Sequence, residues 1–150
     1  MLLRDELPDL TIRVVNVVDL MRLQSDTAHP HGLPDDAFDA LFTTDRPVIF
    51  AFHGYPSLVH QLTYKRTNHA NIHVRGFQEK GTTTTPFDML RLNDLDRYRL
   101  ALDVLHRVPG LAERTRELAQ RWHEARDDAR AYAYEHGEDP DDIAHWEYRA

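Results

Sequence analysis

Two apolar stretches decide the fold class of this chain: Thr11-Ile-Arg-Val-Val-Asn-Val-Val18 and Pro47-Val-Ile-Phe-Ala-Phe52. Both are rich in β-branched residues, and neither shows a regular alternation of apolar and polar positions. A strand that is buried on both faces, as in a parallel sheet, has this composition. We therefore expect strands over residues 11–18 and 47–52. A third, more exposed strand is expected over residues 69–75, where apolar and polar positions alternate.

Helical patterns lie before, between and after these strands. The residues before Pro8 are typical of a helix end, and Pro34 begins a short helix. Thr85-Pro86-Phe87-Asp88 predicts another helix start, because threonine caps, proline fits the first turn and a carboxylate meets free N–H groups there. Apolar residues at helical spacing follow over 95–105 and 111–136. The sequence thus predicts an α/β fold: a mixed, mostly parallel sheet with helices on both faces, and a long C-terminal helix.

Length, charge and composition narrow the class of protein. A chain of 150 residues fits a single domain over residues 1–150. The net charge of -7 disfavours a nucleic-acid or membrane partner, and the absence of cysteine excludes disulfides and thiolate chemistry. No apolar run approaches the roughly 20 residues of a membrane helix, and the charges near the N-terminus are atypical of a signal peptide. We expect a cytoplasmic location.

Ten histidines raise the question of a metal site. His29 and His31 flank a proline in a loop, and His53 follows the second expected strand, where α/β proteins often place ligands. No His-Glu-x-x-His pattern is present, so hydrogen-bonded loop histidines are the alternative. Neither Ser25 nor Ser57 lies in a Gly-x-Ser-x-Gly motif. We therefore assign no catalytic, cofactor-binding or metal-binding residue.

A locally basic segment precedes a threonine run. Between His60 and Gly81, Glu79 is the only acidic residue, against four lysine and arginine residues. The threonines follow Gly81 directly. Backbone and hydroxyl donors ahead of a helix can bind a phosphate or carboxylate, although this is not a Walker loop. A capped helix beside solvated basic residues, or an interface with acidic groups, is the alternative. The candidate anion or interface residues are Lys65, Arg66, Arg75, Lys80, Thr82, Thr83, Thr84 and Thr85.

The apolar stripe of the last helix has two interpretations. It is either core or a face that binds a partner. Its members are Leu118, Trp122, Ala125, Ala129 and Tyr132, and further aromatic residues follow at Tyr134, Trp146 and Tyr148.

Several of these segments together resemble the C-terminal domain of phosphoketolases, most strongly from about Leu10 to Leu111. The segments that carry the resemblance are Arg13-Val-Val-Asn-Val-Val-Asp-Leu-Met21, His29-Pro-His-Gly-Leu33, Phe52-His-Gly-Tyr-Pro56, His69-Ala-Asn-Ile-His-Val-Arg-Gly76, Glu79-Lys-Gly-Thr-Thr-Thr-Thr-Pro-Phe-Asp-Met89 and Asn93-Asp-Leu-Asp-Arg-Tyr98.

The resemblance implies the function of a larger enzyme. Phosphoketolases use thiamine diphosphate and Mg²⁺ to cleave xylulose 5-phosphate or fructose 6-phosphate with inorganic phosphate, giving acetyl phosphate and a shorter aldose phosphate. They are built like transketolases, and this chain resembles their third domain without its first strand and most of its first helix. The Gly-Asp-Gly motif of the family's cofactor site is absent among the six glycines here. We therefore expect no cofactor in this chain and no activity from it alone.

Three functions are compatible with these observations. The first is a scaffold and assembly domain, whose partners are the other domains of the same enzyme, a second subunit in a homo-oligomer, and the sugar phosphate substrate. In that case the basic residues and threonines contact another domain or a substrate phosphate. The second is a free-standing regulatory module that binds phosphate-bearing metabolites through residues 81–86. The third is a small hydrolase that uses the histidines.

Overall fold

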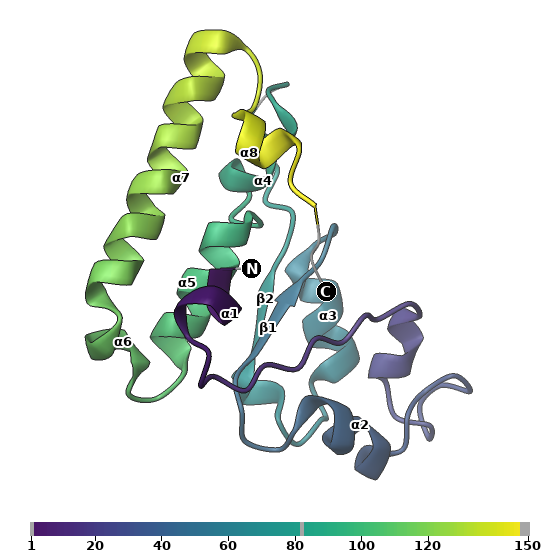
Figure 1. Ribbon diagram of the computed structural model, residues 1–150. Coiled ribbons are helices and arrows are strands. Elements are labelled where there is room, and N and C mark those ends of the chain that lie inside the picture. The colour runs from purple at the N-terminus through teal and green to yellow at the C-terminus, as the bar shows by residue number, and fades with distance from the viewer. Residues whose placement is uncertain (1, 82, 148–150) are drawn as a thin grey trace. The chain divides into compact units, whose positions relative to one another are not determined.

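Two of the three expected strands form, and they pair in parallel (Figure 1). The computed structural model describes residues 2–81 and 83–147 as a mixed α/β protein in which helix predominates. Its contacts divide the chain into two compact units. We call residues 12–76 the sheet unit, and residues 1–11 with 77–150 the helical unit. The expectation of a single domain stays a prediction.

The sheet unit contains both strands and four short helical segments. Val48 pairs with Ile72 at one end of the sheet and Ala51 with Arg75 at the other. Leu23, Phe38 and Val59 form the centre of its core. Its elements are η1 (Leu20–Leu23), α2 (Asp35–Phe42), β1 (Val48–Ala51), α3 (Pro56–Thr63), η2 (His69–Asn71) and β2 (Ile72–Arg75).

The strand expected over residues 11–18 does not form, so this prediction was wrong. The segment 12–18 packs Val15 and Val17 against the core of the sheet unit, whereas Val14 is 85% exposed and Val18 is 89% exposed. No backbone hydrogen bond joins these residues to another part of the described chain. A β-branched sequence favours an extended backbone, but a strand also needs a neighbouring strand to bind its N–H and C=O groups.

The helical unit is built around α5, which packs against α1 and α7. Leu102 and Leu105 of α5 are fully buried at the centre of its core, where Trp122 of α7 also lies. The predicted start of α4 is confirmed: the Thr85 side chain caps it by accepting the N–H of Asp88. Its elements are α1 (Leu2–Glu6), α4 (Pro86–Leu92), α5 (Arg97–Arg107), α6 (Leu111–Arg114), α7 (Arg116–His136) and α8 (Asp141–Ala144).

The long C-terminal helix is present as α7, but a short helix, α6, precedes it instead of one continuous helix from Leu111. The chain leaves helical geometry at Thr115, whose hydroxyl donates to the Leu111 carbonyl. Most of the stripe of α7 is core, because Leu118, Trp122 and Ala129 belong to the buried cluster and Ala125 packs against it, whereas Tyr132 is half-buried. No helix in the described part of the chain combines the length and apolarity that crossing a membrane requires. Tyr134 and Trp146 are exposed, and Tyr148 lies outside the described residues.

Candidate functional site

The loop over residues 24–33, which we call the histidine loop, closes on itself. Ser25 and Leu33 form an isolated bridge at its base, and the N–H of Gly32 donates to the His29 carbonyl at 2.8 Å. A Cβ atom at Gly32 would lie 2.2 Å from the Ser25 carbonyl oxygen, so a larger residue would open the loop. The loop is therefore a compact structure held by its own backbone.

The base of the histidine loop is bound by Arg66, whose side chain is 2% exposed. The sequence suggested this residue as a contact for an anion or another domain. Instead, its guanidinium donates to the carbonyls of Leu23 (2.9 Å), Leu33 (2.9 Å) and Gln24, and to the Asp35 carboxylate (2.6 Å). Arg66 is thus already occupied inside the sheet unit, and any role toward an anion stays a prediction.

One histidine of the loop, His31, is hydrogen-bonded to Asp19, and a second, His29, is hydrogen-bonded to the backbone of His31. Asp19 Oδ2 lies 3.1 Å from His31 Nδ1, and the backbone N–H of His31 donates to His29 Nδ1 at 3.1 Å. The two imidazole rings meet edge to face with centroids 5.3 Å apart. The N–H of Met21, together with hydrogen bonding and attraction from His31, holds the pKa of Asp19 below its ordinary value. Asp19 is therefore an ionised acceptor that orients the His31 ring.

The carboxyl ends of β1 and β2 bring another predicted histidine beside the sheet. His53 is exposed just after β1, and the N–H of Phe52 donates to the Arg75 carbonyl at 2.9 Å. A Cβ atom on Gly76 would lie 2.4 Å from the Gly54 carbonyl oxygen, so the two chain segments after the strands are closely packed. His53 and Arg75 thus lie at the edge where parallel sheets commonly bind ligands.

Lys65 lies at the surface of the same unit. Its ammonium group is 5.5 Å from the centre of the Tyr64 ring, and both residues are exposed. Of the adjacent pair Lys65 and Arg66, Lys65 is therefore the one whose charge can meet a partner.

The threonine run has a different setting in the helical unit. At the N-terminus of α4, Thr85 Oγ1 accepts the Asp88 N–H at 3.3 Å and Thr84 Oγ1 donates to Asp88 Oδ2 at 3.0 Å. The N–H of Phe87 donates to Asp139 Oδ2 at 3.0 Å. Two carboxylates of the chain therefore already occupy the position proposed for an anion, and they would repel another negative charge.

The remaining members of this candidate set are less constrained. Thr83 and Lys80 are exposed, and Thr82 lies outside the described residues. Lys80 and the threonines belong to the helical unit, whereas the other basic candidates belong to the sheet unit. Anion binding by the combined set stays a prediction.

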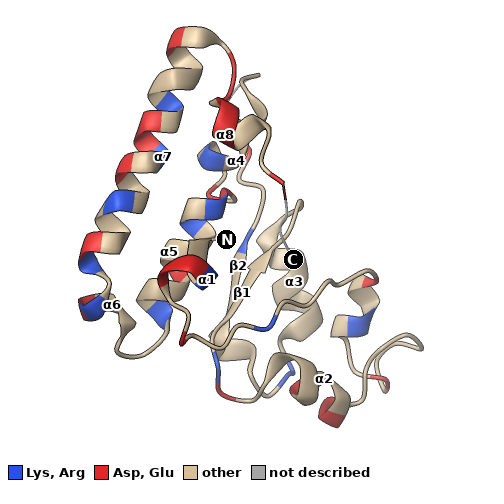
Figure 2. Cartoon of the chain, in the orientation of Figure 1, with Lys and Arg blue, Asp and Glu red and all other residues tan. Residues whose placement is uncertain are grey.

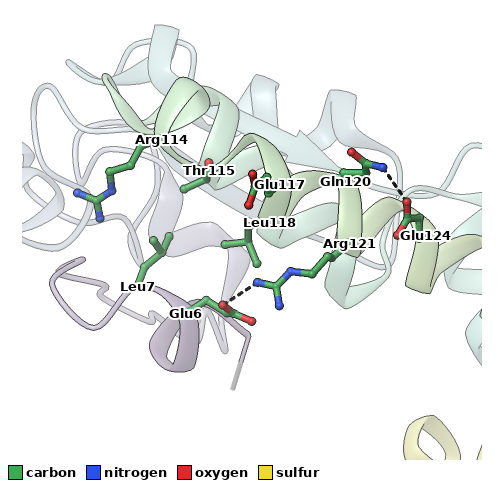
Figure 3. A pocket seen from close by; sticks show the side chains of 9 residues that line it. All are labelled: Glu6, Leu7, Arg114, Thr115, Glu117, Leu118, Gln120, Arg121 and Glu124. Atoms are coloured by element: carbon green, nitrogen blue, oxygen red, sulfur yellow. Dashed lines mark hydrogen bonds and ion pairs between the residues drawn. The ribbon is translucent and has the colours of Figure 1, made fainter.

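A surface hollow of ≈ 550 Å³ between α1 and the α6–α7 region was missed by the sequence reasoning (Figure 3). Glu6 and Arg121 form an ion pair across it, with Oε2 and Nη2 2.9 Å apart. No local pattern could reveal this, because the two residues are 115 positions apart. Charges of both signs line the hollow, so it favours no single class of ionic ligand. Its lining is Glu6, Leu7, Arg114, Thr115, Glu117, Leu118, Gln120, Arg121 and Glu124.

Comparison with known proteins identifies the family to which this chain belongs. The family model described as the XFP C-terminal domain matches residues 1–148. The chain belongs to the XFP C-terminal domain family. This confirms the resemblance inferred from the sequence segments.

Curated relatives of this XFP C-terminal domain carry the name "Probable phosphoketolase". The protein from Mycobacterium avium (strain 104) is 69% identical over 97% of this chain, and that from Nocardia farcinica is 62% identical over 97%. The protein from Rhodopseudomonas palustris (strain HaA2) is 58% identical over 100% of this chain. This chain spans only 18% of the length of the first two relatives and 19% of the third.

The described residues of this XFP C-terminal domain provide no cluster of metal ligands. Among residues 2–81 and 83–147, no three histidine, aspartate or glutamate side chains gather in a way that could hold a metal ion. The sequence also lacks the Gly-Asp-Gly motif. The expectation that this chain holds no cofactor stays a prediction.

Proposed function

We propose that this XFP C-terminal domain is the assembly domain of a phosphoketolase and is inactive alone. The whole enzyme would cleave xylulose 5-phosphate or fructose 6-phosphate with inorganic phosphate, giving acetyl phosphate and an aldose phosphate. This is an aldehyde-lyase reaction of carbohydrate metabolism in the cytoplasm. Support comes from relatives named phosphoketolase, which match 97–100% of this chain while this chain spans 18–19% of their length.

Thiamine diphosphate and Mg²⁺ belong to the rest of the enzyme in this proposal. When bound there, the cofactor supplies the carbanion chemistry. The contribution of this chain is to complete and stabilise the assembly around that site.

The observation that carries the assembly role is the segment 12–18. Val14 and Val18 are almost fully exposed, although valine is normally among the most buried residues. The backbone of the same segment makes no hydrogen bond within the described chain. Unpaired extended backbone beside apolar side chains is a surface onto which another strand can add. We assign this surface to the other domains of the same enzyme or to a second subunit of a homo-oligomer.

Lys65 is a second candidate contact. Lys65 is exposed, whereas the side chain of its neighbour Arg66 is buried and bound to the histidine loop. In the assembled enzyme Lys65 would meet an acidic group of another domain or the phosphate of the substrate.

A complementation experiment tests the proposal. The purified chain is mixed with a phosphoketolase polypeptide that lacks the matching C-terminal part, and acetyl phosphate is measured after addition of xylulose 5-phosphate, phosphate, thiamine diphosphate and Mg²⁺. We expect activity from the mixture and none from either part alone. Acetyl phosphate formation by this chain alone, or cofactor binding by it in calorimetry, would contradict the proposal.

Matched variants locate the assembly surface. We expect Val14→Asp and Val18→Asp to weaken complementation, because a buried unpaired carboxylate opposes strand addition. Tyr134→Asp is the control, since Tyr134 is 69% exposed on α7, outside the proposed surface. Equal losses from all three variants would rule out the segment 12–18 as the specific contact.

Charge reversal at Lys65 tests the second contact. Lys65→Glu should either weaken complementation or raise the KM for the sugar phosphate, and an unchanged result in both measurements would remove Lys65 from the interface. Arg66 is unsuitable for this test because its replacement would disturb the histidine loop itself.

A further inference from the structure

The hydrogen bonds around His31 define which ring nitrogen carries its proton. Asp19 is ionised and can only accept, so His31 Nδ1 at 3.1 Å must be the donor. Nε2 of the neutral ring then keeps a free lone pair. The His31 side chain is 66% exposed, so this lone pair is open to solvent.

The neighbouring histidine has the opposite arrangement. The backbone N–H of His31 always donates, so His29 Nδ1 must accept and the neutral His29 ring carries its proton on Nε2. Because His29 Nε2 has no lone pair in this state, the two rings cannot act together as metal ligands through Nε2. His29 instead offers a hydrogen-bond donor at Nε2, on a ring whose centroid lies 5.3 Å from that of His31.

This orientation distinguishes His31 from other exposed histidines near carboxylates. In the helical unit, His145 Nδ1 lies 3.7 Å from Asp141 Oδ1, and its side chain is 80% exposed. His136 Nε2 lies 3.8 Å from Glu135 Oε2. Both distances exceed that of a hydrogen bond. His145 Nδ1 does donate to the Asp141 backbone carbonyl at 3.3 Å, so its Nε2 is also free, but the partner is a neutral carbonyl and not a carboxylate. What distinguishes His31 is the negative charge of the group that accepts its Nδ1–H.

The carboxylate that orients His31 is itself held in place. Asp19 Oδ1 accepts the Met21 N–H at 2.9 Å, which leaves Oδ2 for the ring. The histidine loop is bound at its base by the buried Arg66. A fixed carboxylate, an oriented imidazole and an accessible ring nitrogen are the parts of an activated histidine nucleophile.

We propose that His31 Nε2 is a phosphoryl-acceptor site for small donors whose leaving group is an amine or a carboxylate. The Nε2 lone pair attacks phosphorus, the bond from phosphorus to the leaving group breaks, and that group departs with the bonding electron pair. The proton on Nδ1 stays in place, and the positive charge that develops on the ring lies beside the Asp19 carboxylate. His29 Nε2–H is available to donate to a phosphoryl oxygen. This inference goes beyond the proposed assembly role and does not depend on it.

The solvent exposure of the His31 ring favours this reaction over general-base catalysis on a bound substrate. Efficient proton transfer requires a substrate held in a fixed pose, whereas an exposed ring nitrogen can react with a small reagent from solution.

Phosphoramidate is the probe for the test. The full chain is incubated with it, and phosphorylated histidines are located by mass spectrometry of peptides kept under alkaline conditions. We expect His31 to be modified several-fold faster than His145 or His53, and His31→Gln to remove the dominant product. Equal modification of the exposed histidines would overturn the proposal.

Two variants distinguish the effect of Asp19 on the orientation of the His31 ring from the effect of its negative charge. Asp19→Asn should slow phosphorylation of His31, although losing a negative charge should by itself help an anionic donor approach. Asp26→Asn, which removes an exposed charge from the same loop, is the control and should leave the rate unchanged or raise it. A faster reaction in both variants would contradict the orienting role of Asp19.

The ring tautomer provides a measurement that needs no variant. Imidazole nitrogen NMR of the wild-type chain should show His31 protonated on Nδ1 and His29 on Nε2 when both rings are neutral. A His31 ring protonated on Nε2 would overturn the proposal even if the Asp19→Asn variant failed to fold.

Discussion

Each unit of this protein contains an arginine that ties distant segments together, buried in the case of Arg66 and partly buried in the case of Arg126, but the two arginines do so with different partners. In the sheet unit, Arg66 donates mainly to backbone carbonyls, and its one carboxylate partner, Asp35, is 76% exposed. In the helical unit, Arg126 donates to Asp94 at 2.6 Å and to the fully buried Asp96 at 2.8 Å. Burial lowers the pKa of Arg126, but attraction to Asp96 and the hydrogen bonds outweigh burial, so its pKa is raised.

The difference follows the distribution of charge along the chain. The sheet unit has six Lys and Arg residues against six Asp and Glu, whereas the helical unit has twelve against nineteen. All of the net charge of -7 therefore belongs to the helical unit, where acidic and basic residues mark α7 along its length (Figure 2). The helical unit uses arginine to neutralise a buried carboxylate, and the sheet unit uses it to bind a loop that carries no buried charge.

Replacing Arg126 should have the largest effect. Arg126→Met leaves the Asp96 carboxylate buried without its cation, which typically lowers the free energy of unfolding by about 3–5 kcal/mol. Tryptophan fluorescence during denaturation measures this unit specifically, since Trp122 and Trp146 are the only tryptophans of the chain. Arg130→Met, one turn later on the exposed face of α7, should change the value by less than about 0.5 kcal/mol.

Replacing Arg66 should have a smaller effect, because no buried charge is left behind. Arg66→Met removes the donor from three carbonyls, and we expect a loss of about 2–3 kcal/mol, since each unmatched buried acceptor costs about 1–3 kcal/mol and loop carbonyls can recruit water. Amide hydrogen exchange in the histidine loop measures this loss of stability. Lys65→Met is the exposed control.

These two variants also test whether the units are independent. Arg126→Met should shift the fluorescence transition, and Arg66→Met should act on the amides of residues 24–33 without moving that transition. Identical shifts in both measurements would show that the two units unfold as one.

The helix caps also differ among the α-helices. Side chains of Thr85 and Asp96 cap α4 and α5, whereas α2 and α3 of the sheet unit and α6, α7 and α8 of the helical unit have no side-chain cap. Thr85→Ala should lower the stability of the helical unit by about 1 kcal/mol. Thr83→Ala, an exposed position outside the cap, should be nearly neutral, and equal effects would contradict the capping role.

The smallest effect concerns pH and Asp19. Its pKa is lowered in the folded state, first by the Met21 N–H and then by His31, so the ionised form stabilises the sheet unit above the unfolded pKa of about 3.9. That contribution is lost as pH falls through the folded value. The hydrogen exchange of loop amides should therefore rise more steeply between about pH 5 and pH 3 in the wild type than in Asp19→Asn. Parallel pH profiles would show that the shift has no effect on stability.

Local signals were enough to predict much of the secondary structure. The strand at Val48–Ala51, the capped start of α4 at Thr85 and the end of the helical region at Gly137 are each encoded within a few residues. The segment 12–18 has an equally strong local signal, yet it forms no strand, because pairing depends on a partner outside the segment.

The candidate site was harder to predict for the same reason. The sequence identified His29 and His31 as loop residues but gave no sign that Asp19, 12 positions before His31, orients the ring. It grouped Lys65 with Arg66 by charge, although Arg66 contacts Leu23, 43 positions earlier, and is buried.

The amino-acid sequence by itself determined the family, the α/β character and the positions of most helices, because composition, spacing and caps act over a few residues. Tertiary structure alone decided which charges are buried, which histidine is oriented and which valines remain exposed. Those outcomes depend on partners tens of residues away, and the free energy of burying a charge or leaving a backbone group unpaired is set by such partners.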